Sequence, residues 1–318
     1  MRTLRICILG GTGFVGRALV SRLTAQGHAL HVVTRRQARH RDLLVYPTLR
    51  LVEGDAQDLG LLRTLFQGAD VVVNLVGILN ERGRDGRGFH RVHVELAGKV
   101  AEACTQARVP RLLHMSALGA SLEAPSHYLR TKAEGEDLVH AEARRGVQVT
   151  SFRPSVIFGP GDSFLNRFAD LLHRVPGIFP LACPDSRFQP VYVGDVAEAF
   201  VRAIDDHHCY GRRYDLCGPK VYTLRQLVEY TAYLCGLERR ILPLGPWQSW
   251  LQAALLEWAP GKPFSLDNYR SLQIDSVCQG EPFPARFGRP RALEEIAPSY
   301  LRPRRDRLDL LRRWARRS

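Results

Sequence analysis

The chain has 318 residues, of which 45% are hydrophobic and 24% are charged. This balance is typical of a folded globular protein and excludes collagen-like and low-complexity classes. No apolar run approaches the ~20 residues that a membrane-spanning helix needs. The formal net charge of +13 comes almost wholly from arginine, and for most of the chain we interpret it as a solvated basic surface.

Seven cysteines, an odd number without a Cys-x-x-Cys pair, indicate reduced thiols and a cytoplasmic location. The first predicted strand is entered by Leu4, so we expect no signal peptide before it. No group of cysteines and histidines has the spacing of a complete metal site, and no metal is predicted.

The stretch that opens the chain predicts a nucleotide-binding turn. An apolar run from Leu4 to Leu9 indicates a buried parallel strand, three glycines follow at three-residue spacing, and helical periodicity begins at Arg17. Glycines allow a tight turn, close approach of the backbone to a pyrophosphate, and close packing of helix on strand. The helix start would bind the phosphates through its free N–H groups. The cofactor-binding residues predicted in this turn are Gly10, Thr12, Gly13, Phe14, Val15 and Gly16.

The predicted second strand, residues 28–34, ends on Arg35 and Arg36. NAD-selective folds carry an acidic side chain at this place for the ribose hydroxyls, whereas an arginine pairs with a 2′-phosphate. Arg35 therefore favours NADP(H) over NAD(H) as the cofactor. A basic loop without a ligand is the alternative interpretation.

Two further strands supply expected crevice residues. They span residues 49–55 and 70–77, and the helices after them are predicted at 58–66 and 89–107. The aspartate that ends the third strand could meet the adenine amine, whereas Asp58 could simply cap the next helix. Because the carboxyl ends of parallel strands line the ligand crevice, the fourth strand should border the dinucleotide. The residues predicted to line it are Asp55, Ala56, Leu75, Val76 and Gly77.

The fifth strand, residues 110–116, ends on Ser116, and Tyr128 opens a helix that runs to about residue 145. Lys132 follows Tyr128 by four residues, so both side chains share one helical face. A surface tyrosine and a solvated lysine are the alternative to a functional pair.

Later segments complete the predicted fold. A sixth strand at 147–153 runs into Pro154, strands follow at 188–193 and 214–219, and Asp195 and Thr223 are expected to cap helices at 196–204 and up to about 234. We predict an α/β fold: a Rossmann-type doubly wound parallel sheet with a smaller C-terminal α/β region for a substrate or partner. The expected division is 1–160 for the nucleotide domain, completed by strands around 187–217, and 161–318 for a mixed region with a basic terminal helix.

These motifs resemble the short-chain dehydrogenase/reductase family in its extended form. The features that carry the resemblance are Gly10, Gly13, Gly16, Asp55, Ser116, Tyr128, Lys132 and the Arg153-Pro154 strand end. Several stretches further resemble the atypical branch that contains the nucleotide-binding accessory subunit of respiratory complex I, alpha-subcomplex subunit nine. Among them are residues 73–77, 116–120, 128–136 and 189–197. The resemblance implies that Arg153 and Pro154 also border the cofactor.

The resemblance implies Ser116, Tyr128 and Lys132 as the catalytic residues. A lysine ammonium lowers the pKa of a nearby phenol, so Tyr128 would exchange a proton with a substrate while Ser116 bonds the same oxygen and Lys132 holds the nicotinamide ribose. Active family members generally carry an asparagine where this chain has His93. His93 could relay protons, or it could be a packed or surface residue.

Two C-terminal segments point to partners. Trp247 to Trp258 is apolar and could cover the crevice, meet a partner or lie at a membrane surface. The segment Arg302–Arg317 contains eight arginines and two aspartates, with an apolar stripe, and indicates an anionic membrane surface or a respiratory complex as partner. A solvated terminal helix is the alternative, and nucleic acid is not expected because no reading module accompanies the charge.

Two functions remain open. In the first, the protein holds NADP(H) structurally and supports respiratory-chain or quinone-linked electron transfer, as a cytoplasmic protein peripheral to the inner membrane. In the second, it is an active NADP-dependent reductase, dehydrogenase or epimerase that uses Tyr128 and Lys132 on a small carbonyl or hydroxyl substrate.

Overall fold

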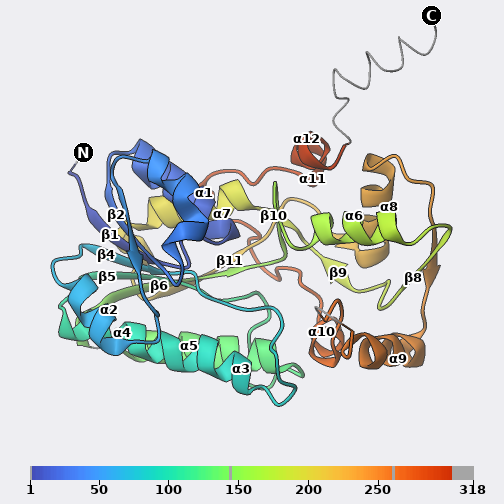
Figure 1. Cartoon of the computed structure of the whole chain (residues 1–318), viewed down its shortest axis with the longest axis horizontal. Helices are drawn as coiled ribbons and strands as arrows, with labels where there is room; N and C mark the ends of the chain where they lie inside the picture. The colour runs from blue at the N-terminus through green and yellow to red at the C-terminus, as the bar shows by residue number, and fades with distance from the viewer. Residues whose placement is uncertain (1, 143–144, 260–261, 303–318) are drawn as a thin grey trace, which may run out of the picture.

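The computed structural model describes residues 2–142, 145–259 and 262–302. Its centre is a seven-stranded parallel sheet in the order β3-β2-β1-β4-β5-β6-β11 (Figure 1). Because strand order reverses between β1 and β4, the carboxyl ends of these strands are where sheets of this kind bind their ligands. The predicted doubly wound sheet is confirmed. Its strands are β1 (Arg5–Leu9), β2 (Ala29–Thr34), β3 (Leu49–Glu53), β4 (Val71–Asn74), β5 (Arg111–Met115), β6 (Gln148–Pro154) and β11 (Arg212–Leu216).

Helices cover both faces of this sheet. Helices α1 (Phe14–Ala25) and α7 (Val193–Ala203) pack together on one face. The other face carries α2 (Leu59–Phe66), α4 (Leu96–Gln106) and α5 (His127–Glu142), as Figure 1 shows below the strands. Burial on both sides explains why β4 is a run of valines without polar alternation.

The predicted helix boundaries are partly confirmed. Asp58 caps α2, since its carboxylate accepts hydrogen bonds from the N–H groups of Gly60 and Leu61. Thr223 caps α8 (Leu224–Leu234) in a capping box. Helix α1 begins three residues earlier than predicted, directly after the glycine turn.

The prediction that Asp195 caps a helix at 196–204 is wrong. Helix α7 begins at Val193 with Tyr192 as its N-cap, which places Asp195 in the first turn. There its carboxylate accepts hydrogen bonds from the backbone and the guanidinium of Arg291, at 2.7 to 3.0 Å. The acidic side chain therefore fastens a distant C-terminal segment to α7.

The helix predicted at 89–107 is interrupted. It consists of α3 (Arg87–His90), a π-helical turn (Arg91–Glu95) and α4. This turn packs closely against α5, because a Cβ atom at Gly135 would lie 1.9 Å from the carbonyl oxygen of His93. Such one-turn π-bulges are frequent at functional sites.

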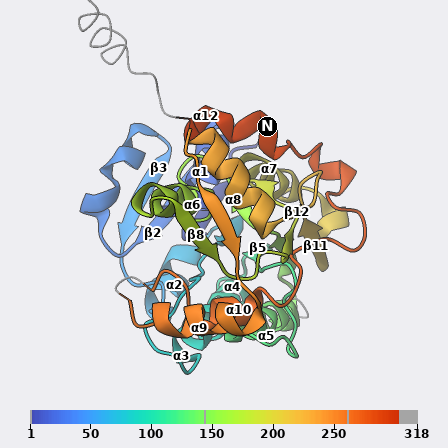
Figure 2. The same cartoon turned by 90° about the vertical axis from the view of Figure 1, so that its right-hand side faces the viewer.

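The rest of the described chain forms a second body beside the sheet, with its own hydrophobic core (Figures 1 and 2). The strand predicted at 188–193 is wrong as a single element, because β9 (Arg187–Phe188) and β10 (Val191–Tyr192) belong to different two-stranded sheets. The other elements of this body are β7 (Ile157–Phe158), α6 (Leu165–Arg174), β8 (Ile178–Leu181), β12 (Tyr222–Thr223), β13 (Arg240–Pro243), α9 (Pro246–Leu256), α10 (Leu266–Ser271), α11 (Leu293–Ile296) and α12 (Pro298–Leu301). Three 3-10 turns, at Gln37–Val45, His207–Cys209 and Ala285–Phe287, pack instead on the core of the sheet.

The expectation that all cysteines are reduced is wrong. Cys217 and Cys278 form a disulfide whose Cα atoms are 6.2 Å apart, and the other five cysteines are free. Pairing across 61 residues depends on the tertiary fold, which brings the segment after α10 to the end of β11. Within the described ranges, no helix is long and apolar enough to cross a membrane.

Candidate functional site

The glycine turn after β1 leaves no room for side chains. Gly10 has φ of +78°, a left-handed conformation that favours glycine. A Cβ atom at Gly16 would lie 2.3 Å from the carbonyl oxygen of Gly10, so α1 packs directly on the turn. Gly13 is the N-cap of α1, and no side chain caps this helix. The turn therefore presents a bare helix start of the kind that holds a pyrophosphate.

The rest of this turn is fixed by side-chain contacts. The guanidinium of Arg17 donates to the carbonyl of Thr12 at 3.1 Å and pairs with Asp42. Phe14 is half-buried and Val15 is buried, both against the core between α1 and the sheet. Phe14 and Val15 therefore hold the turn in place through packing.

The residues predicted to face the adenosine are exposed, and the loop after β2 is basic. Arg35 and Arg36 follow β2, and both are exposed. Among the described residues Arg35 has no ion-pair partner within 4.0 Å. Asp55 after β3 is exposed, and its carboxylate accepts a hydrogen bond from the N–H of Gln57 at 3.0 Å, while Ala56 is half-buried.

The end of β4 meets both the turn and the lysine. Leu75 is buried, Val76 is half-buried and Gly77 is exposed. The backbone of Leu75 is so close to the turn that a Cβ atom at Gly10 would lie 3.0 Å from it. A Cβ atom at Gly77 would lie 3.3 Å from Nζ of Lys132. The structure thus brings the fourth strand, the turn and the ammonium group together.

Tyr128 and Lys132 lie one turn apart on α5, where Lys132 is buried and Tyr128 is half-buried. Lys132 Nζ donates to the carbonyl of Met115 at 2.8 Å. Burial lowers the pKa of Lys132 to about 8, and Glu136 opposes this shift. Tyr128 packs edge-on against Phe89. Burial raises the pKa of Tyr128 to about 12, so the lowered phenol pKa expected from the sequence is not found.

Ser116 faces a buried carboxylate. Its hydroxyl donates to Glu136 at 2.8 Å, and Glu136 is fully buried. Arg153 Nε binds the same carboxylate at 2.9 and 3.0 Å, and Arg213 lies 3.4 Å away. Pro154, buried at the end of β6, receives a backbone hydrogen bond at its carbonyl. Ser116 and Arg153 therefore meet at Glu136, which sequence reasoning missed.

His93 lies on the π-helical turn with both ring nitrogens engaged. Nε2 accepts from the N–H of Ile78 at 3.1 Å, and Nδ1 lies 3.0 Å from Thr131 Oγ1. The Thr131 hydroxyl donates to the carbonyl of His127 at 2.8 Å, so Nδ1 must carry the ring proton and donate. Burial and the charge of Lys132 lower the pKa of His93 to about 2. A proton relay through this histidine is therefore not supported.

Asp267 is a second residue that the sequence did not reveal. It lies on α10, 140 residues from His127, and its carboxylate accepts hydrogen bonds from the N–H groups of His127 at 2.7 Å and Tyr128 at 3.1 Å. Ser126 accepts from the next N–H, that of Leu129. The start of the helix that carries Tyr128 is thus held by the C-terminal body.

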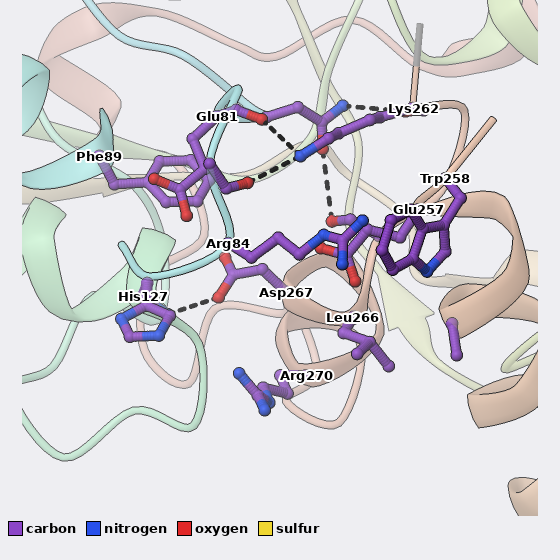
Figure 3. Close-up of a pocket in the computed structure, with 14 residues that line it drawn as sticks. Glu81, Arg84, Phe89, His127, Glu257, Trp258, Lys262, Leu266, Asp267 and Arg270 are labelled. Carbon is purple, nitrogen blue, oxygen red and sulfur yellow. Dashed lines mark hydrogen bonds between the residues drawn. The ribbon is translucent and has the colours of Figure 1, made fainter. Parts of the chain in front are cut away.

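A cavity of about 180 Å³ borders this helix start (Figure 3). It lies between the loop before α3, α9 and α10, and its lining combines acidic, basic and aromatic side chains. Arg84 stacks 3.4 Å over the ring of Trp258, and Lys262 donates to three successive carbonyls of the loop, those of residues 81–83. Within the described ranges no cluster of three or more histidine, cysteine, aspartate or glutamate residues is placed to hold a metal.

Comparison with known families settles the class of this fold. The sequence model described as the NAD dependent epimerase/dehydratase family matches residues 6–217. The chain belongs to this family. Members of the family bind a dinucleotide, which agrees with the close-packed glycine turn after β1.

Relatives of this epimerase/dehydratase protein include subunits of complex I. The mouse NADH dehydrogenase (ubiquinone) 1 alpha subcomplex subunit 9 is 33% identical over 85% of this chain and 72% of its own length. The rat protein is matched over 59% of its length. Ceramide reductase from Caulobacter vibrioides is 34% identical over 62% of this chain and 59% of its own.

Solved structures share the fold. The dTDP-glucose 4,6-dehydratase DesIV of Streptomyces venezuelae, with NAD bound, superposes with a TM-score of 0.74 at 20% identity and covers 94% of this chain and 96% of its own. UDP-glucose 4-epimerase of Thermus thermophilus, also with NAD, gives 0.66 at 21% identity over 84% of this chain and 99% of its own.

Proposed function

We propose that this protein holds NADP(H) as a resident nucleotide and supports respiratory-chain or quinone-linked electron transfer. The observation that carries the proposal is the turn after β1, where Gly10 and Gly16 have no space for a Cβ atom and α1 begins without a side-chain cap. The exposed guanidinium of Arg35 stands where a 2′-phosphate would be recognised. Gly77 and Lys132 mark the opposite, nicotinamide end.

A holding role, in preference to turnover, is supported by how the surrounding polar groups are used. Ser116 is bonded to Glu136, and the two nitrogens of His93 are bonded to Ile78 and Thr131. The hydrogen-bonding atoms of both side chains are therefore occupied by contacts within the protein. Tyr128, with its raised pKa, stays protonated at neutral pH, so its phenolate is scarcely available as a general base.

The proposed partner is inferred from the complex I subunits to which this chain is similar. We propose that the protein associates with a respiratory complex or with an anionic membrane surface through Arg302–Arg317. Apart from the exposed Arg302, this segment lies outside the described residues. Nucleic acid is not proposed as a partner.

The test is to identify the nucleotide that leaves the natively purified protein on denaturation, by mass spectrometry. We expect NADP(H) in near-stoichiometric amount. Arg35→Ser should shift the ratio of NADP to NAD affinity at least about tenfold toward NAD, because one charge-assisted contact is lost. Arg174→Ser, on the exposed surface of α6, is the control and should leave this ratio unchanged. Absence of any dinucleotide would contradict the proposal.

A working NADP-dependent reductase, dehydrogenase or epimerase is the second candidate. Two observations favour it. The ammonium group of Lys132 lies beside Gly77 at the end of β4, and Lys132 lies on the same helix as Tyr128. When bound, the nicotinamide would supply hydride transfer. Lys132 would orient the ribose, and the Tyr128 hydroxyl would move a proton to or from the substrate oxygen. The Caulobacter relative is named for a reductase activity.

Turnover separates the two candidates. A panel of carbonyl and sugar-nucleotide substrates is assayed for NADPH consumption with the purified protein and with Tyr128→Phe. The enzymatic candidate requires that Tyr128→Phe abolish consumption while nucleotide affinity is nearly unchanged. Tyr233→Phe, at an exposed position of α8, is the matched control. No turnover by the unmodified protein on any substrate leaves only the holding role.

A further inference from the structure

Helix α9 presents an uncovered aromatic face. Trp247 is 68% exposed, Trp250 51%, Leu255 65%, and Trp258, just beyond the helix, 75%. Counted from Trp247, the other three positions lie at i+3, i+8 and i+11, spacings that return to one broad side of a helix. Three of the four tryptophans of the chain are gathered here. Apolar patches of this kind on a folded protein mark sites of interaction.

The opposite face of α9 is fixed to the protein. The hydroxyl of Ser249 accepts from the N–H of Cys183 at 3.1 Å, and Gln252 Nε2 donates to the carbonyl of Pro180 at 3.1 Å. Ala253 is fully buried between them. The helix therefore cannot rotate its tryptophans inward without breaking these bonds.

The charges beside the aromatic face are mainly basic. Helix α9 contains no charged residue, and the neighbouring loop 82–87 carries three exposed arginines and one aspartate, Asp85, which pairs with Arg87 at 3.0 Å. Arg84 of this loop stacks on Trp258, which joins the two parts into one surface (Figure 3). Figures 1 and 2 both show α9 and α3 along the same lower edge of the molecule. We call α9, Trp258 and loop 82–87 the tryptophan–arginine surface.

We propose that the tryptophan–arginine surface binds a lipid bilayer that contains anionic phospholipids. Tryptophan rings favour the headgroup region, and an uncharged helix face enters it without burying a charge. Arginines beside that face attract anionic headgroups. With 11 residues, α9 is suited to lie in the interface. In both views α12 lies at the opposite edge of the molecule, so this contact is distinct from that proposed for Arg302–Arg317.

The test is co-sedimentation of the full chain with vesicles of phosphatidylcholine alone or of equal parts phosphatidylcholine and phosphatidylglycerol. The protein should bind the anionic vesicles, with a blue shift of its tryptophan fluorescence. The double variant Trp250→Gln/Leu255→Gln should lose binding by about tenfold or more, since two apolar side chains no longer enter the interface. Tyr233→Gln, equally exposed on α8, is the matched control and should bind like the unmodified protein.

Three further measurements decide between occupants. Arg84→Gln/Arg87→Gln should weaken binding to anionic vesicles while leaving dinucleotide content unchanged, which separates this proposal from that for the nucleotide. A chain lacking 303–318 should retain binding that depends on α9. The proposal is overturned if that chain no longer binds while the double variant does. It is equally overturned if light scattering shows a dimer that the double variant abolishes, with no vesicle binding.

Discussion

The carboxylate of Asp267 holds the start of α5, and it should contribute more to the free energy of unfolding than an exposed ion pair on α5 does. Asp267→Ala leaves the N–H groups of His127 and Tyr128 without their acceptor. An unpaired, partly buried N–H costs about 1–3 kcal/mol, so we expect the free energy of unfolding to fall by about 3 kcal/mol. Asp267→Asn retains an acceptor oxygen but loses the charge at the helix start, for a loss of about 1 kcal/mol.

The measurement is urea unfolding followed by circular dichroism, with nucleotide affinity measured on the folded variants. Asp137→Ala is the matched control, because Asp137 lies on α5, the helix whose start Asp267 holds, and is a half-exposed carboxylate paired with Arg213. It should cost ~0–1 kcal/mol. The reasoning is refuted if Asp267→Ala costs no more than Asp137→Ala. The reasoning is also refuted if Asp267→Ala leaves nucleotide affinity unchanged. Loss of the acceptor should move the start of α5, and with it Tyr128.

Gly16→Ala should destabilise the protein by ~1–3 kcal/mol and lower dinucleotide affinity, because the new Cβ atom would collide with a backbone carbonyl 2.3 Å away. Gly280→Ala is the control: a Cβ atom there meets open space, so stability and dinucleotide affinity should change little. The pKa of His93 is depressed to about 2, so the unfolded state binds more protons below pH ~6.5 and stability falls as pH decreases. His93→Asn should reduce that acid-side slope by about 1.4 kcal/mol per pH unit, measured by unfolding between about pH 4 and 6; an unchanged slope would contradict the burial of a neutral ring. In denaturant, five of the seven cysteines should react with a thiol reagent before reduction, and all seven should react after it. Seven reactive thiols before reduction would disprove the pairing of Cys217 with Cys278. Cys217→Ser should lower the free energy of unfolding of the oxidised protein by ~3–4 kcal/mol.

Local patterns predicted much of the sheet and part of the site. The apolar runs of β1 and β4, the glycine spacing and the four-residue step from Tyr128 to Lys132 all depend on neighbours along the chain. The same holds for Asp58, whose cap bonds reach only three residues. Periodicity and turn chemistry are sufficient for features of this range.

The remaining features of the site depend on contacts between distant segments. Asp267 reaches α5 across 140 residues, and Glu136 gathers Ser116 and Arg153 only because β5, β6 and α5 are packed together. The predicted cap at Asp195 failed because α7 begins at Val193, and the carboxylate of Asp195 instead binds Arg291 from a distant part of the chain. Single-sequence reasoning has no access to such partners.

The position of β11 at the edge of the sheet constrains how the chain reaches its folded state during synthesis. Residues 212–216 pair with β6 only after the segment that forms α6, β8 and α7 has been made. Until then β6 is an open edge and the face over α1 lacks α7, so the nascent chain exposes a pairing strand to its neighbours on a polysome. A fragment ending at residue 160 would keep both liabilities permanently, and we expect it to aggregate.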